Sequence, residues 1–239
     1  MPFHLLPVLL LLGLGMAYSA RAGKLTIPAV WTGGGLGVSI YLGAGWVGLG
    51  LLALFFGLGT AASAWKVADK RRLGLAEANK GRRTASQVVA NAGVAGLLGL
   101  WAWQSPTHAP LCRLLLAGSF AAATADTLAS ELGNIYGRRY VNILTFRPDQ
   151  RGLDGVISLE GTLLGLAGTA LVAGVYCVVY GWLPAFWVLL LAGTAGNLAD
   201  SLLGATLERR RYLPNDAVNF LNTLIGALTA AGLYAWSIH

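Results

Sequence analysis

The sequence predicts an all-α fold: a polytopic membrane helix bundle of about eight transmembrane helices. Hydrophobic residues make up 56% of the chain and charged residues only 11%, against about 25% charged in an ordinary soluble domain. The chain divides into apolar stretches of roughly 20 residues, the length needed to cross the hydrocarbon of a bilayer. Its 33 glycines suit helices that pack closely in lipid. We therefore expect a single transmembrane domain over residues 1–239.

The apolar stretches define the individual spans. We expect them near residues 3–20, 25–42, 45–65, 84–103, 110–132, 156–180, 183–207 and 216–237. The first stretch is short and ends in Ala20-Arg21-Ala22, so a cleaved signal peptide is an alternative for it. However, no Lys or Arg precedes this stretch, whereas Arg21 and Lys24 follow it. That order of charges favours a retained helix with its N-terminus outside.

The basic residues predict the orientation in the membrane. With both termini outside, the inner loops are residues 21–24, 66–83, 133–155 and 208–215, and they contain 16 of the 17 Lys and Arg residues. Only Arg113 falls on the outer side. This distribution agrees with the positive-inside rule, by which basic residues concentrate in cytosolic loops. We expect an integral protein of the cell (inner) membrane or an equivalent organelle membrane.

The net charge of +7 needs no nucleic-acid partner. Topogenesis and contact with anionic lipid headgroups account for it, and a phosphate-binding rim is the alternative for residues 66–83.

The acidic residues all map to inner loops or to the cytosolic ends of spans. Asp126 and Asp200 lie within spans, where a charge costs at least about 2.5 kcal/mol and so requires a partner. A salt bridge to a nearby arginine is one explanation. Several carboxylates at one depth favour the other, a bound cation.

Helical spacing places polar residues on shared faces. The seventh span carries Asn197 and Asp200 between glycines, and the fifth carries Asp126, Ser130 and Glu131. Asparagines repeat at the start of the eighth span, beside Asp216: Asn215, Asn219 and Asn222. Such stripes also serve as packing contacts between membrane helices, which stays open for the asparagines. Three stripes at one depth favour a shared site.

A short internal repeat links two of these spans. Ala125-Asp126-Thr127-Leu128 matches Ala199-Asp200-Ser201-Leu202, and both helices are expected to run from outside to inside. The repeat suggests two equivalent helices that each donate one aspartate to a metal ion.

Other common motifs are absent or misplaced. The run Gly43–Gly48 fits GxGxxG, but it lies at an outer turn between two apolar spans with no strand before it. The sequence contains no GxxxxGK[ST] motif. All three histidines and both cysteines map toward the outside, which disfavours zinc binding and cysteine–histidine catalysis.

Four segments together resemble a membrane family formerly of unknown function that includes the phytyl-phosphate kinases of plants and cyanobacteria. They are residues 80–93 (KGRRTASQVVANAG), 124–133 (TADTLASELG), 160–162 (EGT) and 215–220 (NDAVNF). The resemblance runs from Gly23 onward. The chain departs from the family at Leu128, where the family often has tryptophan, and at Asp154, where it often has glutamate.

The resemblance implies a kinase of tocopherol-type lipid metabolism. Such an enzyme transfers a phosphoryl group from a nucleoside triphosphate, commonly CTP, to a prenyl monophosphate. The implied metal is Mg²⁺, held by Asp126, Glu131 and Asp200, which with Asn219 form the expected catalytic set. Phosphate or substrate contacts are expected from Lys80, Arg82, Arg83, Gln87, Asn91, Ser130, Gly155, Ser158, Glu160, Asn197, Asn215, Asp216 and Asn222. The expected partners are the prenyl phosphate, the nucleotide, membrane lipids and, as an open possibility, a second copy of the chain.

Three other functions stay open at this point. A transporter also places polar stripes within helices, although its site usually lies near the bilayer midplane. A lipid-binding scaffold needs the basic rim but not the buried acids. A phospholipid cytidylyltransferase uses the same ions as a kinase but releases diphosphate.

Overall fold

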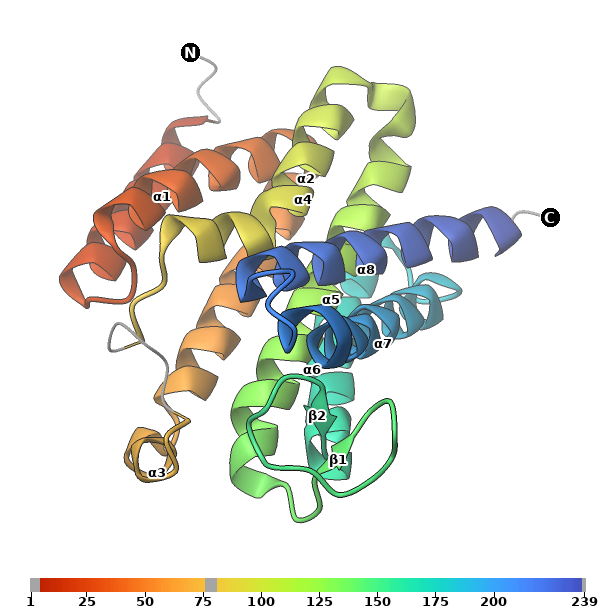
Figure 1. Ribbon diagram of the computed structural model, residues 1–239. Coiled ribbons are helices and arrows are strands. Elements are labelled where there is room, and N and C mark those ends of the chain that lie inside the picture. The colour runs from red at the N-terminus through yellow and green to blue at the C-terminus, as the bar shows by residue number, and fades with distance from the viewer. Residues whose placement is uncertain (1–4, 76–80, 238–239) are drawn as a thin grey trace.

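The computed structural model describes residues 5–75 and 81–237. Its helices are α1 (Leu5–Arg21), α2 (Ile27–Ala64), α3 (Val67–Arg72), α4 (Ala85–Gln104), α5 (Ala109–Tyr136), α6 (Leu159–Tyr180), α7 (Ala185–Leu203) and α8 (Asn215–Ser237) (Figure 1). The predicted helical membrane bundle is confirmed. The departure from all-α is a small antiparallel sheet of β1 (Val141–Asn142) and β2 (Val156–Ile157), which pairs Val141 with Ile157.

Six helices in the described part of the chain are long and apolar enough to cross a membrane: α2, α4, α5, α6, α7 and α8. The count of about eight also included the N-terminal stretch and divided residues 25–65 into two spans. Helix α1 is apolar but has 17 residues, which is short for a span. The exact number of spans therefore stays a prediction.

Helix α2 folds back on itself at Gly45. This residue has φ 59° and ψ −148°, a backbone conformation that glycine adopts without steric cost. Residues at both ends of α2 meet Arg83: its carbonyl oxygen accepts from the Thr26 N–H at 3.0 Å, and its guanidinium packs against Gly59. A straight helix would separate residues 26 and 59 by about 50 Å. The two halves are therefore antiparallel, the first beside α1 and the second leading to α3 (Figure 1).

Helix α5 is the centre of the bundle. It packs against α2, α4, α6, α7 and α8, and residues 114–125 are all buried. Small residues allow close approach to α6, where a Cβ atom at Gly133 would lie 2.8 Å from the Gly161 Cα atom. Close backbone contact of this kind provides dispersion attraction where lipid removes most of the hydrophobic driving force.

The basic loops meet at one end of the bundle. The Arg83 N–H donates to the Lys24 carbonyl at 2.9 Å, and the Trp65 indole donates to the Tyr136 hydroxyl at 2.8 Å. At the opposite end, the Arg113 guanidinium donates to the Gly43 carbonyl at 2.9 Å, beside the bend of α2. The structure thus segregates the loops as the charge pattern predicts. Which end faces the cytosol stays a prediction.

Candidate functional site

A cavity of about 250 Å³ lies at the end of the bundle where the basic loops meet. Its walls come from α4, α5, α6, α7, α8 and the loop between α5 and α6. We call it the acidic cavity because five carboxylates line it. Most of the predicted site residues line it: Arg83, Gln87, Asn91, Asp126, Ser130, Glu131, Gly155, Ser158, Asn197, Asp200, Asn215 and Asn219.

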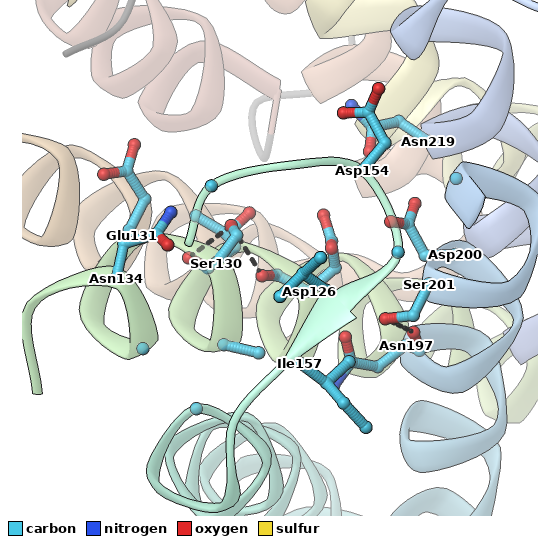
Figure 2. Close-up of a pocket in the computed structure, with 18 of the residues that line it drawn as sticks. Asp126, Ser130, Glu131, Asn134, Asp154, Ile157, Asn197, Asp200, Ser201 and Asn219 are labelled. Atoms are coloured by element: carbon cyan, nitrogen blue, oxygen red, sulfur yellow. Dashed lines mark hydrogen bonds between the residues drawn. The ribbon is translucent and has the colours of Figure 1, made fainter. Parts of the chain in front are cut away.

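The carboxyl groups of Asp126 and Asp200 face each other across the cavity, close enough to share a hydrogen bond. Figure 2 shows them extending into one space from α5 and α7. The Asp200 Oδ1 atom is buried and has no hydrogen-bond partner among the described residues. Neither aspartate pairs with a Lys or Arg there, so the arginine salt bridge considered above is not formed. Two carboxylates at this distance require a shared proton or a cation.

Two further carboxylates, which the sequence analysis did not select as site residues, approach the pair. Asp154 and Glu208 also line the cavity, and both interact electrostatically with Asp200. Burial raises the pKa of Asp154 above its ordinary value, and the positive charge of Arg209 opposes that rise. The sequence signals that could have selected them were the departure from the family at Asp154 and the position of Glu208 at the predicted cytosolic end of a span.

The backbone around Gly155 explains how Asp154 reaches α7. Gly155 has φ 73°, and a Cβ atom there would overlap Ala205 in the π-helical turn Gly204–Glu208 that follows α7. Only glycine fits both the conformation and the contact. The loop therefore lies directly on the end of α7, with Asp154 next to the aspartate pair. This is a structural role for Gly155, which was predicted as a substrate contact.

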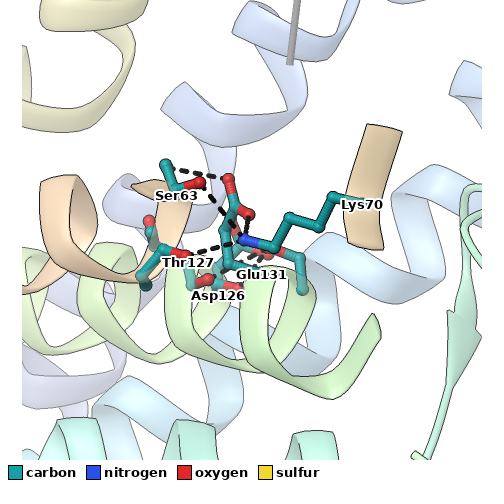
Figure 3. A network of polar contacts seen from close by, with 7 residues as sticks. Ser63, Lys70, Asp126, Thr127 and Glu131 are labelled. Carbon is teal, nitrogen blue, oxygen red and sulfur yellow. Dashed lines mark hydrogen bonds and ion pairs between the residues drawn. The ribbon is translucent and has the colours of Figure 1, made fainter. Parts of the chain in front are cut away.

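Glu131 also lines the acidic cavity, but its carboxylate bonds to residues outside the Asp126–Asp200 pair. Its Oε2 atom forms an ion pair with Lys70, and its Oε1 atom accepts a hydrogen bond from the Ser63 hydroxyl at 2.8 Å (Figure 3). The Lys70 side chain is 2% exposed and also donates to the Ala62 carbonyl at 2.7 Å. From the sequence, Lys70 belonged to the basic run 66–83, expected to be topogenic or a phosphate-binding rim, and Ser63 was not selected. The pairing explains why Glu131 tolerates its position next to the membrane.

The predicted set of three acidic magnesium ligands is therefore not assembled. Across residues 5–75 and 81–237, no group of three or more His, Cys, Asp or Glu side chains is arranged to hold a metal ion. The Asp126–Asp200 pair by itself fits a hard cation, since it offers carboxylate oxygens and one of them, Asp200 Oδ1, is orphaned. Magnesium stays a prediction.

Hydrogen bonds fix the polar side chains in the cavity wall. Thr84 and Gln87 form a reciprocal capping box at the start of α4, with 2.8 Å from the Thr84 N–H to Gln87 Oε1. The Asn91 amide donates to the Gln87 carbonyl at 2.9 Å, and the Asn219 amide donates to Asn215 Oδ1 at 3.1 Å. These contacts orient the amides before any ligand arrives.

Two serines in the cavity wall form hydrogen bonds with backbone groups of their own helices. Ser130 donates to the Asp126 carbonyl at 2.9 Å, and Ser158 accepts from the Gly161 N–H at 3.1 Å as the N-cap of α6. Ser158, at the start of this helix, was predicted as a phosphate or substrate contact. The first free N–H groups of the helix are instead partly satisfied by this cap.

The remaining predicted residues do not line the cavity. Arg82 is exposed, and Glu160 contacts Arg138, whose N–H donates to it at 3.3 Å. Asp216 lies about 100° around α8 from Asn215. Asn222 lies on the same face of α8 as Asn215 and Asn219 but deeper in the bundle. Its side chain is wholly buried against Gly196 of α7. Lys80 lies outside the described residues.

Residues 9–227 match the model of the family described as "Integral membrane protein DUF92". Protein VTE6, chloroplastic, of Arabidopsis thaliana is 34% identical over 203 residues, which cover 82% of this chain and 61% of that protein. An uncharacterised membrane protein of Synechocystis is 36% identical over 206 residues, 84% of this chain and 79% of that protein.

A third relative, Protein PGR of Arabidopsis thaliana, is 30% identical over 201 residues, 73% of this chain and 69% of that protein. The chain thus spans less than two thirds of the length of VTE6 but more than two thirds of the other two. No solved structure matches the chain. The family match covers nearly all of its helices, and the chain therefore belongs to the DUF92 family of integral membrane proteins.

Proposed function

We propose that this protein is a membrane-embedded prenyl monophosphate kinase that uses a nucleoside triphosphate, preferably CTP, and yields a prenyl diphosphate. The observation that carries the proposal is the facing pair Asp126 and Asp200, in one cavity with Arg83, at the basic end of the bundle. The segments that resemble the phytyl-phosphate kinases, residues 80–93, 124–133 and 215–220, supply the α4, α5 and α8 walls of this cavity.

The proposed reaction is an in-line phosphoryl transfer. An oxygen of the prenyl phosphate forms a bond to the γ-phosphorus of the nucleotide while the bond from that phosphorus to the bridging oxygen breaks. The nucleoside diphosphate is the leaving group. A bound Mg²⁺ supplies neutralisation of the phosphate charge.

The chain's own residues hold and orient the reactants. Asp126 and Asp200 provide carboxylate oxygens for the cation. The Arg83 guanidinium donates to phosphate oxygens in a geometry that a lysine does not reproduce. The preset amides of Asn91 on α4 and Asn219 on α8, both in the cavity wall, orient the phosphates.

The two substrates differ in polarity, and the cavity offers a side suited to each. Leu198 of α7 lines the cavity and is 39% exposed, so the wall includes an apolar side chain that an apolar lipid chain can contact. The nucleotide arrives from water at the end where the basic loops meet. Long-range attraction between those loops and the triphosphate speeds its encounter.

Product analysis on purified protein tests the proposal. The assay contains Mg²⁺, a panel of phytyl, farnesyl and geranylgeranyl monophosphates, and CTP or ATP labelled on the γ-phosphate. We expect label in a prenyl diphosphate, with release of the nucleoside diphosphate and loss of both in the Asp126→Asn variant. In a parallel assay with CTP labelled on cytidine, release of inorganic diphosphate with transfer of that label to lipid would identify a cytidylyltransferase instead. Absence of any labelled lipid with every pair of substrates contradicts the proposal.

A further inference from the structure

A second cavity, of about 550 Å³, adjoins the acidic cavity. It lies between the α1–α2 turn, the end of α2, the start of α3 and the segment before α4. We call it the basic cavity. Its described lining is Ala22, Gly23, Lys24, Thr60, Ser63, Ala64, Val67, Arg71, Gly81 and Arg83.

The charge of this lining is opposite to that of the acidic cavity. It brings together the side chains of Lys24, Arg71 and Arg83, and no Asp or Glu is among its described residues. Neither Lys24 nor Arg71 forms an ion pair with a carboxylate in the part of the chain that the structure describes. Cations gathered in a concave site repel one another and attract an anion.

The two cavities share a wall. Arg83 lines both, and Ser63 lines the basic cavity while its hydroxyl donates to Glu131, which lines the acidic one. Figure 3 shows this hydroxyl beside the Lys70–Glu131 pair. An anion in the basic cavity therefore lies next to the site of the proposed chemistry.

Hydrogen bonds and packing position the segments that carry these three cations. The Arg83 N–H donates to the Lys24 carbonyl at 2.9 Å, and the Arg83 carbonyl accepts from Thr26 at 3.0 Å. The Arg83 guanidinium lies 5.3 Å from the centre of the Phe55 ring. Arg71 belongs to α3, which the buried Lys70 anchors to α5. Topogenesis requires positive charge in a loop but not a cavity built around it.

We infer that the basic cavity binds a phosphate group, held by Lys24, Arg71 and Arg83. Guanidinium and ammonium donors form charge-assisted hydrogen bonds with phosphate oxygens, and the Thr60 hydroxyl adds a neutral partner in the same lining. The phosphate belongs either to the donor nucleotide or to the headgroup of an anionic lipid. Its assignment to the nucleotide rests on the proposed function, whereas the binding site itself does not.

Direct binding measurements test this inference without catalysis. The protein is reconstituted in phosphatidylcholine nanodiscs, and calorimetry measures the Kd of CTP and of inorganic diphosphate. A parallel arm uses nanodiscs of equal parts phosphatidylcholine and phosphatidylglycerol, and native mass spectrometry counts the phosphatidylglycerol that stays bound after the disc is removed. We compare Lys24→Ala and Arg71→Ala with Arg72→Ala, a neighbour that is 82% exposed and outside the cavity.

We expect Lys24→Ala and Arg71→Ala to weaken binding about tenfold in one arm, as the loss of one charged hydrogen bond predicts. Arg72→Ala should stay within about twofold of the unsubstituted protein. A response in the CTP and diphosphate arm identifies the nucleotide, and a response in the lipid arm identifies the headgroup. If both variants match Arg72→Ala in both arms while their melting temperatures are unchanged, the inference is wrong.

The outcomes also separate this inference from the proposed function. A protein that binds phosphate through Lys24 and Arg71 but produces no prenyl diphosphate contradicts the kinase proposal alone. An active kinase whose phosphate binding is indifferent to both substitutions contradicts the basic cavity alone.

Discussion

The ammonium group of Lys70 on α3 is buried against the carboxylate of Glu131 on α5, so a short helix at the bundle surface is fixed to the central helix. The two side chains are 2% and 13% exposed. Since Glu131 lines the acidic cavity and α3 carries Arg71 into the basic cavity, one ion pair positions parts of both.

Breaking this ion pair should destabilise the protein. Lys70→Met leaves the Glu131 carboxylate without its cation, and Glu131→Gln leaves a buried ammonium, so each should cost about 3–5 kcal/mol of unfolding free energy. The double variant should lose less than the sum of the two, because it leaves neither charge alone. Equilibrium unfolding in mixed micelles measures the unfolding free energy of the two single variants and the double variant. Arg72→Met, which removes an exposed partner of Asp69 at 3.8 Å, is the matched control and should change little.

Substitution of the two membrane aspartates should remove activity without unfolding the protein. Asp126→Asn and Asp200→Asn keep nearly the same size and relieve the repulsion between two facing carboxylates. Turnover should fall by more than about a hundredfold in each, and the double variant should be little worse, since the ligands of one ion act as a unit. Magnesium-dependent turnover and melting temperature are measured on the same preparations. An active but unstable Asp200→Asn protein would refute the cation assignment.

The Asp149–Arg209 pair predicts a dependence of stability on pH. The Arg209 guanidinium, 2.8 Å away, and two further hydrogen bonds hold the pKa of Asp149 below its ordinary value. A depressed pKa means that the ionised carboxylate stabilises the fold above the unfolded value of about 3.9, and that this contribution is lost as the pH falls through the folded value. Asp149→Asn should therefore lower the melting temperature at neutral pH.

The difference from the unsubstituted protein should begin to narrow near the unfolded pKa and should close below the folded pKa of Asp149, which is lower. Melting temperatures over that range, with Asp69→Asn as the exposed control, provide the check. A difference that persists unchanged into strong acid would show that Asp149 acts through its shape rather than its charge.

Close packing between α2 and α4 should make Gly99 intolerant of a side chain. A Cβ atom at position 99 would lie 2.9 Å from the Ile40 Cα atom and would overlap the Ser39 carbonyl, both of which are backbone. Gly99→Ala should cost about 1–3 kcal/mol of unfolding free energy, since neither backbone can give way cheaply. Gly50→Ala, where nothing lies within 4 Å, should leave stability almost unchanged. Equal effects of the two substitutions would contradict the packing shown here.

Thiol labelling tests the orientation of the bundle. Cysteines introduced at Arg72 and Arg147, both exposed in basic loops, should react with an impermeant reagent only from the cytosolic side. A cysteine at Thr107, in the turn Pro106–His108 at the other end, should react only from outside. The native Cys112 and Cys177 are buried and should contribute little background. Labelling of Arg147→Cys from outside would reverse the predicted topology.

Local patterns in the sequence were enough to predict the helices, the end of the bundle that holds the charges, and the faces that carry polar residues. A segment in lipid must be a long apolar run whose backbone groups hydrogen-bond within the protein. These properties can therefore be predicted from local composition and helical period. The same period correctly placed Asn197 with Asp200, and Asn215 with Asn219, on the cavity wall.

How deeply a polar side chain is buried, and which side chain it pairs with, could be read only from the folded chain. Helical spacing gives the face of Asn222 but not its burial against α7, and it says nothing of the Lys70–Glu131 pair, whose members are 61 positions apart. The approach of Asp154 to Asp200 depends on a loop that lies on the π-helical turn after α7. Such contacts follow from the close packing of glycines on α5, α6 and α7 and from the bend at Gly45, because only the folded chain specifies how near two distant backbones come.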